Sequence, residues 1–112
     1  IEEDLDLIAT LHGVDIAIAG GGDELLSNPG DLLIPGDEAA VYGPYPLYAV
    51  DAEGRNVPII TTSGAYRYIG RLVTGFDENG ELVAIDMADS DLLALALWRG
   101  GDLMRRATLG GN

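Results

Sequence analysis

The spacing of apolar and polar positions divides the chain into a short helix, a buried strand, a long loop and a series of further strands. Ile1, Leu5, Ile8 and Leu11 recur at helical spacing, and acidic residues occupy the first turn, so residues 1–11 are predicted to form an amphipathic helix. Apolar side chains then fill all but one position of residues 14–19 (Val14, Ile16, Ala17, Ile18 and Ala19), which is typical of a central strand covered on both faces.

The second half of the chain has the composition of strands joined by tight turns. Residues 47–50, 56–62, 66–74 and 81–87 are rich in β-branched and aromatic side chains. Polar turns at residues 51–54 and 77–80 separate them, and Asn79-Gly80 is a dipeptide favoured in hairpin turns. Residues 77–80 lack the ligand run of a calcium loop, so these segments predict antiparallel hairpins.

The C-terminal residues predict a helix from Asp91 to Arg99. Asp89 or Ser90 is a suitable N-cap, the residues that follow are apolar over most of the helix circumference, and Gly100 and Gly101 end it. The remaining residues show no clear pattern. We therefore expect an α/β (α+β) fold in which residues 1–87 form one unit and residues 88–112 form a helix and tail of unclear role.

Residues 20–46 form the long loop and contain four of the five prolines. Loops longer than about 12–15 residues are uncommon in compact domains unless they are functional or disordered. Residues 31–35 are too apolar for a free linker. We expect an ordered excursion that packs Leu32, Leu33 and Ile34 and carries acids around the mouth of a site; the alternative is a surface loop without a function.

The junction between the apolar strand and this loop is the first candidate for chemistry. Gly20, Gly21 and Gly22 allow backbone conformations that other residues avoid, and Asp23 and Glu24 follow directly. Ligands of open α/β sheets bind at the carboxyl ends of strands. The alternative is that the glycines only turn the chain and the acids cap a following helix.

The same residues carry a family resemblance. The segment GVDIAIAGGGDELL, residues 13–26, resembles the strand GVDVIVGGHSHTLL of bacterial 5'-nucleotidases, which belong to the calcineurin-like metallophosphoesterases. Two later segments, VYGPYP (41–46) and VPIITTSGAYRYIGRL (57–72), resemble the part of that family in which the sheet is completed. The resemblance covers about residues 1–86 and implies the C-terminal part of a catalytic domain, with a partial metallophosphoesterase-type β-sandwich.

The resemblance also implies a metal site that this chain supplies only in small part. The family's Gly-His-Ser-His loop provides imidazoles to a two-metal centre, and the register places Gly21 and Asp23 at the two histidine positions. Glycine has no ligating side chain, whereas the carboxylate of Asp23 can bind a divalent cation. We therefore predict Asp23 as a metal ligand and Gly20, Gly21 and Gly22 as substrate-binding residues, with no catalytic residue of the chain's own.

Charge and composition exclude several classes of partner. The chain has 19 acidic and 6 basic residues, a net charge of −13, and such a surface repels nucleic acids and anionic membranes. No apolar run is long enough to span a membrane. His12, the single histidine, is a ligand candidate, but its place at the end of a helix favours contact with the last carbonyls. Arg67 and Arg71 are candidates for a phosphate clamp, or they pair with surface acids.

These observations lead to two expectations about function. The first is a part of a secreted 5'-nucleotidase-like phosphoesterase that hydrolyses nucleotide phosphomonoesters. The intact protein would bind divalent ions (Mn, Zn, Mg or Ca). This chain by itself would bind few of them or none. The second is a catalytically degenerate relative that binds ligands or assembles an extracellular complex. The expected partners are a nucleotide or other phosphoester and other segments of the same protein, in an extracellular, periplasmic or cell-surface location.

Overall fold

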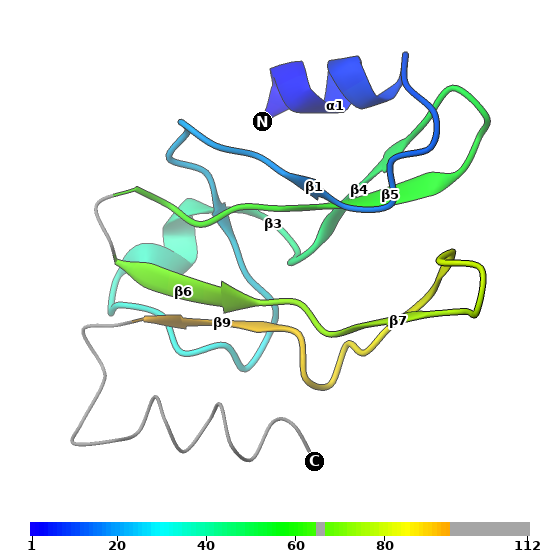
Figure 1. The fold of residues 1–112 in the computed structure, drawn as a ribbon. Helices are drawn as coiled ribbons and strands as arrows, with labels where there is room; N and C mark the ends of the chain where they lie inside the picture. The colour runs from blue at the N-terminus through cyan, green and yellow to red at the C-terminus, as the bar shows by residue number, and fades with distance from the viewer. Residues whose placement is uncertain (65–66, 95–112) are drawn as a thin grey trace.

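The computed structural model describes residues 1–64 and 67–94, and Figure 1 shows the arrangement of its elements. The helix α1, the sheet formed by β1, β5 and β4, and the pair β6 and β9 lie in successive layers (Figure 1). The elements in chain order are α1 (Glu2–Ile8), β1 (Ala17–Ile18), β2 (Leu25–Leu26), the 3-10 helix η1 (Asp37–Ala40), β3 (Val41–Gly43), β4 (Leu47–Val50), β5 (Asn56–Ile60), β6 (Tyr68–Arg71), β7 (Thr74–Phe76), β8 (Leu82–Ile85) and β9 (Asp91–Ala94). This mixture of one α-helix and short strands agrees with the predicted α/β (α+β) class.

The N-terminal helix is shorter than predicted and ends at Ile8. Single hydrogen-bonded turns follow it as far as Leu11. Three of its four acids lie in the first turn, where the positive end of the helix dipole favours them. Ile8 is buried against Ala49, Val57 and Ile59 of the sheet. Ile1 and Leu5 also pack against this cluster, so the apolar stripe holds the observed helix on the sheet, whereas Leu11 beyond it is exposed.

The three-stranded sheet combines a parallel and an antiparallel pair. β4 and β5 form the predicted hairpin, with Leu47 opposite Ile59 and Val50 opposite Asn56. The buried Asp51 stabilises the turn, because its Oδ1 accepts hydrogen bonds from the backbone N–H groups of Glu53 and Arg55, each at 2.9 Å. β1 pairs with β5 in parallel, on the edge of β5 that faces away from β4.

The prediction of a central strand at residues 14–19 was wrong for the part of the chain that the structure describes. Only Ala17 and Ile18 form a strand, and that strand is at the edge of the sheet. Ile18 is 78% exposed, whereas Ala19 is buried. An apolar run carries no information about which neighbours cover it, and here one face and one edge of β1 remain open.

Residues 20–46 are an ordered excursion, as predicted. Within it β2 pairs with β3 in parallel, a pairing that the sequence did not reveal because each strand has only two or three residues. Leu33 and Ile34 pack against a core cluster, but Leu32 is 46% exposed. The core cluster consists of Leu25, Leu26, Tyr45, Tyr68, Leu92 and Ala94.

One side chain ties two parts of this excursion together, and two others fasten it to β6 and the residue before that strand. The side chain of Asn28 binds the backbone of Tyr45 on both sides, accepting from its N–H and donating to its carbonyl. The hydroxyl of Tyr68 donates to the carboxylate of Asp37 and accepts from the backbone N–H of Ile34 at 3.1 Å. Arg67 pairs with the same carboxylate. These contacts connect residues about 17 to 34 positions apart in the chain.

The prediction of a helix starting at Asp91 was also wrong. Asp91–Ala94 form β9, which pairs antiparallel with β6, and Tyr68 lies opposite Ala94. Ser90 does not cap a helix; its Oγ accepts a hydrogen bond from the backbone N–H of Val73 at 2.9 Å. A short apolar run fits a buried strand as well as a helix, and pairing with β6 decides between them. Residues 95–99 of the predicted helix lie outside the described residues.

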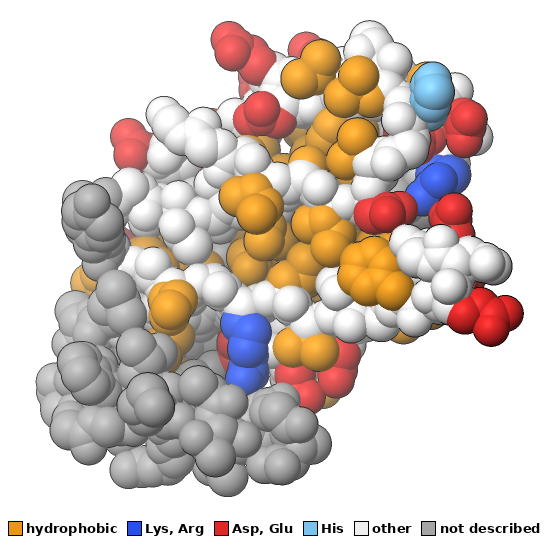
Figure 2. Space-filling model, viewed as in Figure 1, with side chains coloured by type: hydrophobic (Ala, Val, Ile, Leu, Met, Phe, Trp, Pro, Cys, Tyr) orange, Lys and Arg blue, Asp and Glu red, His pale blue; other side chains and the backbone are white. Residues whose placement is uncertain are grey.

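The β7–β8 hairpin confirms the predicted turn at residues 77–80. The carboxylate of Asp77 accepts hydrogen bonds from the backbone N–H groups of Asn79 and Glu81, and Gly80 has the positive φ of 79° that the turn requires. Figure 2 shows apolar side chains spread over the face of the molecule seen in Figure 1. Among the described residues, no helix is long and apolar enough to cross a membrane.

Strand β6 passes directly over the buried ring of Tyr45. A Cβ placed on Gly70 would lie 2.7 Å from the Tyr45 Oη and 3.1 Å from its Cζ, and Tyr45 is only 1% exposed. In contrast, a Cβ on Gly75 of β7 would lie 3.8 Å from the nearest atom, the Cβ of Ala84. Both glycines lie in strands, but only Gly70 lacks room for a side chain, so a substitution at Gly75 is a control for the same substitution at Gly70.

We expect Gly70→Ala to destabilise the chain by about 1–3 kcal/mol, because the added methyl group overpacks a buried ring. Gly75→Ala should leave stability unchanged or raise it slightly, since alanine loses less entropy than glycine in a strand. Urea unfolding followed by circular dichroism measures both. Equal unfolding midpoints for the two variants would contradict the close approach of β6 to Tyr45.

The contact between Tyr68 and Asp37 predicts a dependence of stability on pH. The hydrogen bond from Tyr68, followed by the interaction with Arg67, lowers the pKa of Asp37 below its ordinary value of 3.8. The stability that this carboxylate contributes is therefore fully present above the unfolded pKa and is lost as the pH falls through the folded pKa. We expect Asp37→Asn to lose less stability than the parent chain between about pH 5 and about pH 2. Thermal melts across this range measure the difference, with Asp6→Asn, which removes an exposed acid of α1, as the control.

Candidate ligand cleft

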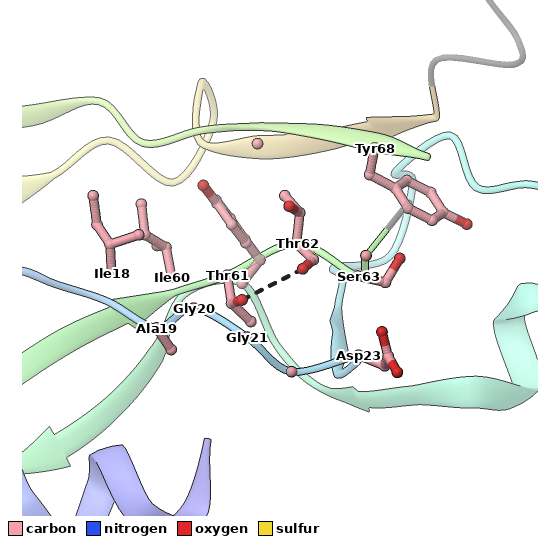
Figure 3. Close-up of a pocket in the computed structure, with 14 residues that line it drawn as sticks. Ile18, Ala19, Gly20, Gly21, Asp23, Ile60, Thr61, Thr62, Ser63 and Tyr68 are labelled. Carbon is pink, nitrogen blue, oxygen red and sulfur yellow. Dashed lines mark hydrogen bonds between the residues drawn. The ribbon is translucent and has the colours of Figure 1, made fainter. Parts of the chain in front are cut away.

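A cleft of about 710 Å³ opens where the parallel strands β1 and β5 end. The loops that follow these strands form two of its walls, with residues 18–23 on one side and residues 60–64 on the other. Tyr45, Tyr68 and Gly70 complete the lining (Figure 3). The carboxyl ends of parallel strands meet at the same edge of a sheet, which is where open α/β sheets bind their ligands.

The glycine loop lies along this cleft, so the structure brings all three predicted substrate-binding residues to it. Gly20, Gly21 and Gly22 are among the lining residues, and Gly21 has a φ of 79°, which side chains disfavour. A Cβ on Gly22 would collide with the carboxylate of Glu24. At Gly20 and Gly21 a Cβ would meet no atom within 4 Å, so this part of the wall is backbone next to open space.

Asp23, the predicted metal ligand, also lines the cleft. Its side chain is exposed, and its Oδ1 lies 2.9 Å from the position that a Cβ on Gly64 would occupy. Gly64 therefore leaves the space in which the carboxylate lies. None of the other acids of residues 20–46 belongs to the described lining of the cleft.

Hydroxyl groups from the loop after β5 line the facing wall. Thr61 donates a hydrogen bond to the carbonyl of Thr62 at 3.4 Å. Ser63 is 8% exposed, and its Oγ has no hydrogen-bond partner among the described residues. Sequence reasoning missed these residues because it assigned residues 56–62 to hairpins only. The signal for them was the run Thr-Thr-Ser-Gly directly after a strand, the same arrangement that drew attention to the glycine loop.

Two tyrosines close the cleft on the side of β6. Burial, together with the negative charges of Asp91 and Asp31, raises the pKa of Tyr45 to about 12. Burial and then the hydrogen bond to Asp37 raise the pKa of Tyr68. Both phenols are therefore protonated at neutral pH and bring no charge to the cleft, and the hydroxyl of Tyr68 is already engaged by Asp37 and Ile34.

The described residues do not fit a complete metal centre. They contain no group of three or more histidine, cysteine, aspartate or glutamate side chains that could hold a metal ion. The cleft lining contains a single carboxylate, and His12 is an exposed residue outside it. A two-metal site needs several ligands around ions about 3.5–4 Å apart. Asp23 could supply one of these ligands at most.

Neither of the arginines considered for a phosphate clamp belongs to the lining. Arg67 pairs with Asp37, and the Nε of Arg71 lies 3.5 Å from a carboxylate oxygen of Asp91. The alternative interpretation, in which these arginines pair with surface acids, is therefore confirmed. The described lining of the cleft combines one carboxylate, several hydroxyl groups and exposed backbone, without a cationic side chain.

Comparisons with known proteins point to one group of enzymes. No family model matches the chain. The chain is 30% identical to 5'-nucleotidase from Bos taurus over 84 residues, which are 73% of this chain and 14% of that protein. It is 28% identical to human 5'-nucleotidase over 85 residues, 74% of this chain and 14% of that protein. An apyrase from Aedes aegypti is 29% identical over 82 residues, 72% of this chain and 15% of that protein.

Comparison of the fold with solved structures points to the same group of enzymes. The crystal structure of a 5'-nucleotidase precursor from Thermus thermophilus superimposes with a TM-score of 0.68 and 30% sequence identity, covering 83% of this chain and 17% of that one. The chain thus spans about one seventh of the length of the curated relatives that it matches. It is a 5'-nucleotidase-like segment, related to these proteins both in sequence and in fold.

Proposed function

We propose that the chain is part of a 5'-nucleotidase-like phosphoesterase that hydrolyses phosphomonoesters of nucleotides, and that it supplies one wall of the substrate cleft. The observation that supports this function is the position of the glycine loop and Asp23 at the carboxyl end of β1, beside the loop after β5. The relatives named 5'-nucleotidase match the chain over about three quarters of its length.

In this proposal the segment positions substrate and other segments perform the hydrolysis. Gly20 and Gly21 leave room for a ligand to approach the backbone, because no atom lies near the position of a Cβ on either residue. Asp23 is the side chain that would face a divalent ion in the intact protein. The remaining ligands would come from residues outside the described part of the chain, since this part holds no group of three ligating side chains.

A second candidate is a relative that binds nucleotides without hydrolysing them. Gly21 and Asp23 occupy the positions at which the resemblance places two imidazoles, and Gly21 cannot ligate a metal ion. Loss of ligands at such positions weakens a metal site while leaving the cleft intact. Either candidate would act in an extracellular, periplasmic or cell-surface location. The similarity to a snake venom 5'-nucleotidase, 28% identical over 81 residues, supports this location.

The chain by itself should not hydrolyse p-nitrophenyl phosphate when Mn²⁺ or Zn²⁺ is added. One carboxylate in the cleft cannot hold the ions that such hydrolysis requires. Release of p-nitrophenol, followed by absorbance over hours, checks this expectation. Turnover that scales with the concentration of purified chain would show that the chain contains a complete site.

The intact protein separates the two candidates. If it is a phosphoesterase, it should release phosphate from AMP, and Asp23→Ala should lower kcat/KM by at least about tenfold through weakened metal binding. Asp6→Ala, on the outer face of α1, should leave the rate unchanged. Binding of AMP without release of phosphate would favour the second candidate. The absence of both binding and hydrolysis would refute both candidates.

We also expect the isolated chain to bind a hydrophobic dye such as ANS. Ile18 at the open edge of β1 is 78% exposed, and Val83 of β8 is 63% exposed. In the proposed parent, other segments would cover such surface. Fluorescence of the dye with Ile18→Thr should be lower than with the unaltered chain. A chain that binds no dye would contradict the need for covering segments.

A further inference from the structure

The turn between β7 and β8 carries the dipeptide Asn79-Gly80 at the surface of the molecule. Both residues are exposed, and Gly80 has a φ of 79°. Figure 1 shows this turn at the outer end of the hairpin that β7 and β8 form. The Asn79 side chain is therefore open to water.

An asparagine side chain reacts with the backbone of the residue that follows it. The backbone nitrogen of that residue gives up its proton to hydroxide and attacks the asparagine Cγ. A new N–C bond forms, and the side-chain nitrogen leaves as ammonia. Water then opens the cyclic imide at one of its two carbonyls, which gives aspartate or isoaspartate. Glycine favours this attack because it has no Cβ beside its nitrogen and adopts backbone conformations that other residues avoid.

The structure separates Asn79 from the two other asparagines of the described residues. Asn28 precedes Pro29, whose nitrogen carries no hydrogen and cannot attack, and two hydrogen bonds to backbone groups hold the Asn28 side chain. Asn56 precedes Val57, a β-branched residue of strand β5 that is only 1% exposed. Asn79 alone among the three is both exposed and followed by glycine.

The carboxylate of Asp77 holds the same turn closed. Its Oδ1 accepts hydrogen bonds from the backbone N–H groups of Asn79 at 2.9 Å and Glu81 at 3.0 Å. The N–H of Gly80 donates to the backbone carbonyl of Asp77 at 3.0 Å. The nitrogen that must attack is therefore engaged in the closed turn, so the reaction requires a local opening of the hairpin.

We propose that Asn79 is a site of spontaneous deamidation and that Asp77 sets its rate by holding the turn closed. The reaction uses only hydroxide and water, and it is independent of the proposed nucleotide function. Its product adds a negative charge to an acidic turn, and isoaspartate also inserts a further carbon atom into the backbone. Arg55 lies 3.8 Å from a carboxylate oxygen of Glu81 and 3.1 Å from one of Asp15. The modification therefore acts beside a contact that connects the hairpin to the segment before β1.

Incubation of the 112-residue chain at mildly alkaline pH for several days tests the site. Peptide mapping by mass spectrometry measures conversion at each asparagine, and a protein isoaspartyl methyltransferase labels the isoaspartate product. Conversion at Asn79 should exceed that at Asn28 and Asn56 by at least about tenfold, because only Asn79 precedes an unhindered nitrogen. Equal conversion at Asn79 and Asn56, or none at Asn79, would overturn the assignment.

Two variants of the turn test the role of Asp77. Asp77→Ala should raise the rate at Asn79 by at least about fivefold, since both hydrogen bonds of the carboxylate are lost. Glu78→Ala removes an exposed acid of the same turn and should leave the rate as it is in the parent chain. An unchanged or lower rate in Asp77→Ala would show that the closed turn does not protect Asn79.

The rate at Asn56 in the same Asp77→Ala sample distinguishes local opening from loss of the fold. Asn56 belongs to β5, so unfolding of the whole chain accelerates its conversion together with that of Asn79. Opening of the hairpin alone accelerates conversion at Asn79 and leaves Asn56 unchanged. Parallel acceleration at both asparagines would refute the local role of Asp77.

Discussion

The parallel pairing of β1 with β5 is the contact on which the cleft depends. It joins residues 17–18 to residues 59–60, more than forty positions later in the chain. Because the two strands run in the same direction, the loops that follow them leave the sheet at the same edge. The glycine loop and the Thr-Thr-Ser-Gly segment face each other for this reason alone. An antiparallel arrangement would have sent the two loops to opposite ends of the sheet.

The wall opposite the sheet is held in place by a different set of contacts. Tyr45 and Tyr68 belong to the core cluster that also contains Leu26 and Leu92, and both also line the cleft. Gly70 allows β6 to lie against the ring of Tyr45, while Asp37 receives the hydroxyl of Tyr68. The same side chains therefore stabilise the fold and shape the site. A change that loosens the core at these residues is expected to alter the cleft as well.

The described residues share the fold of a segment of a 5'-nucleotidase without holding a metal centre of their own. Phosphate chemistry at two ions needs many ligands. The described lining instead has one acid, several hydroxyl groups and bare backbone. Such a wall leaves open space beside the backbone of Gly20 and Gly21. The negative charge of a phosphate would have to be balanced by groups from another part of the protein.

Local patterns determined the elements whose partners are close in sequence. Hairpins at residues 51–54 and 77–80 follow from turn residues that bind their own backbone, and the resemblance of residues 13–26 located the glycine loop. Long-range pairing decided the rest. Residues 91–94 form a strand because β6 offers an edge, although their apolar pattern also suits a helix. Ile18 is exposed because β1 lies at an edge. Only the folded chain brings Ser63 next to Asp23, since no local pattern records which loops meet across a sheet.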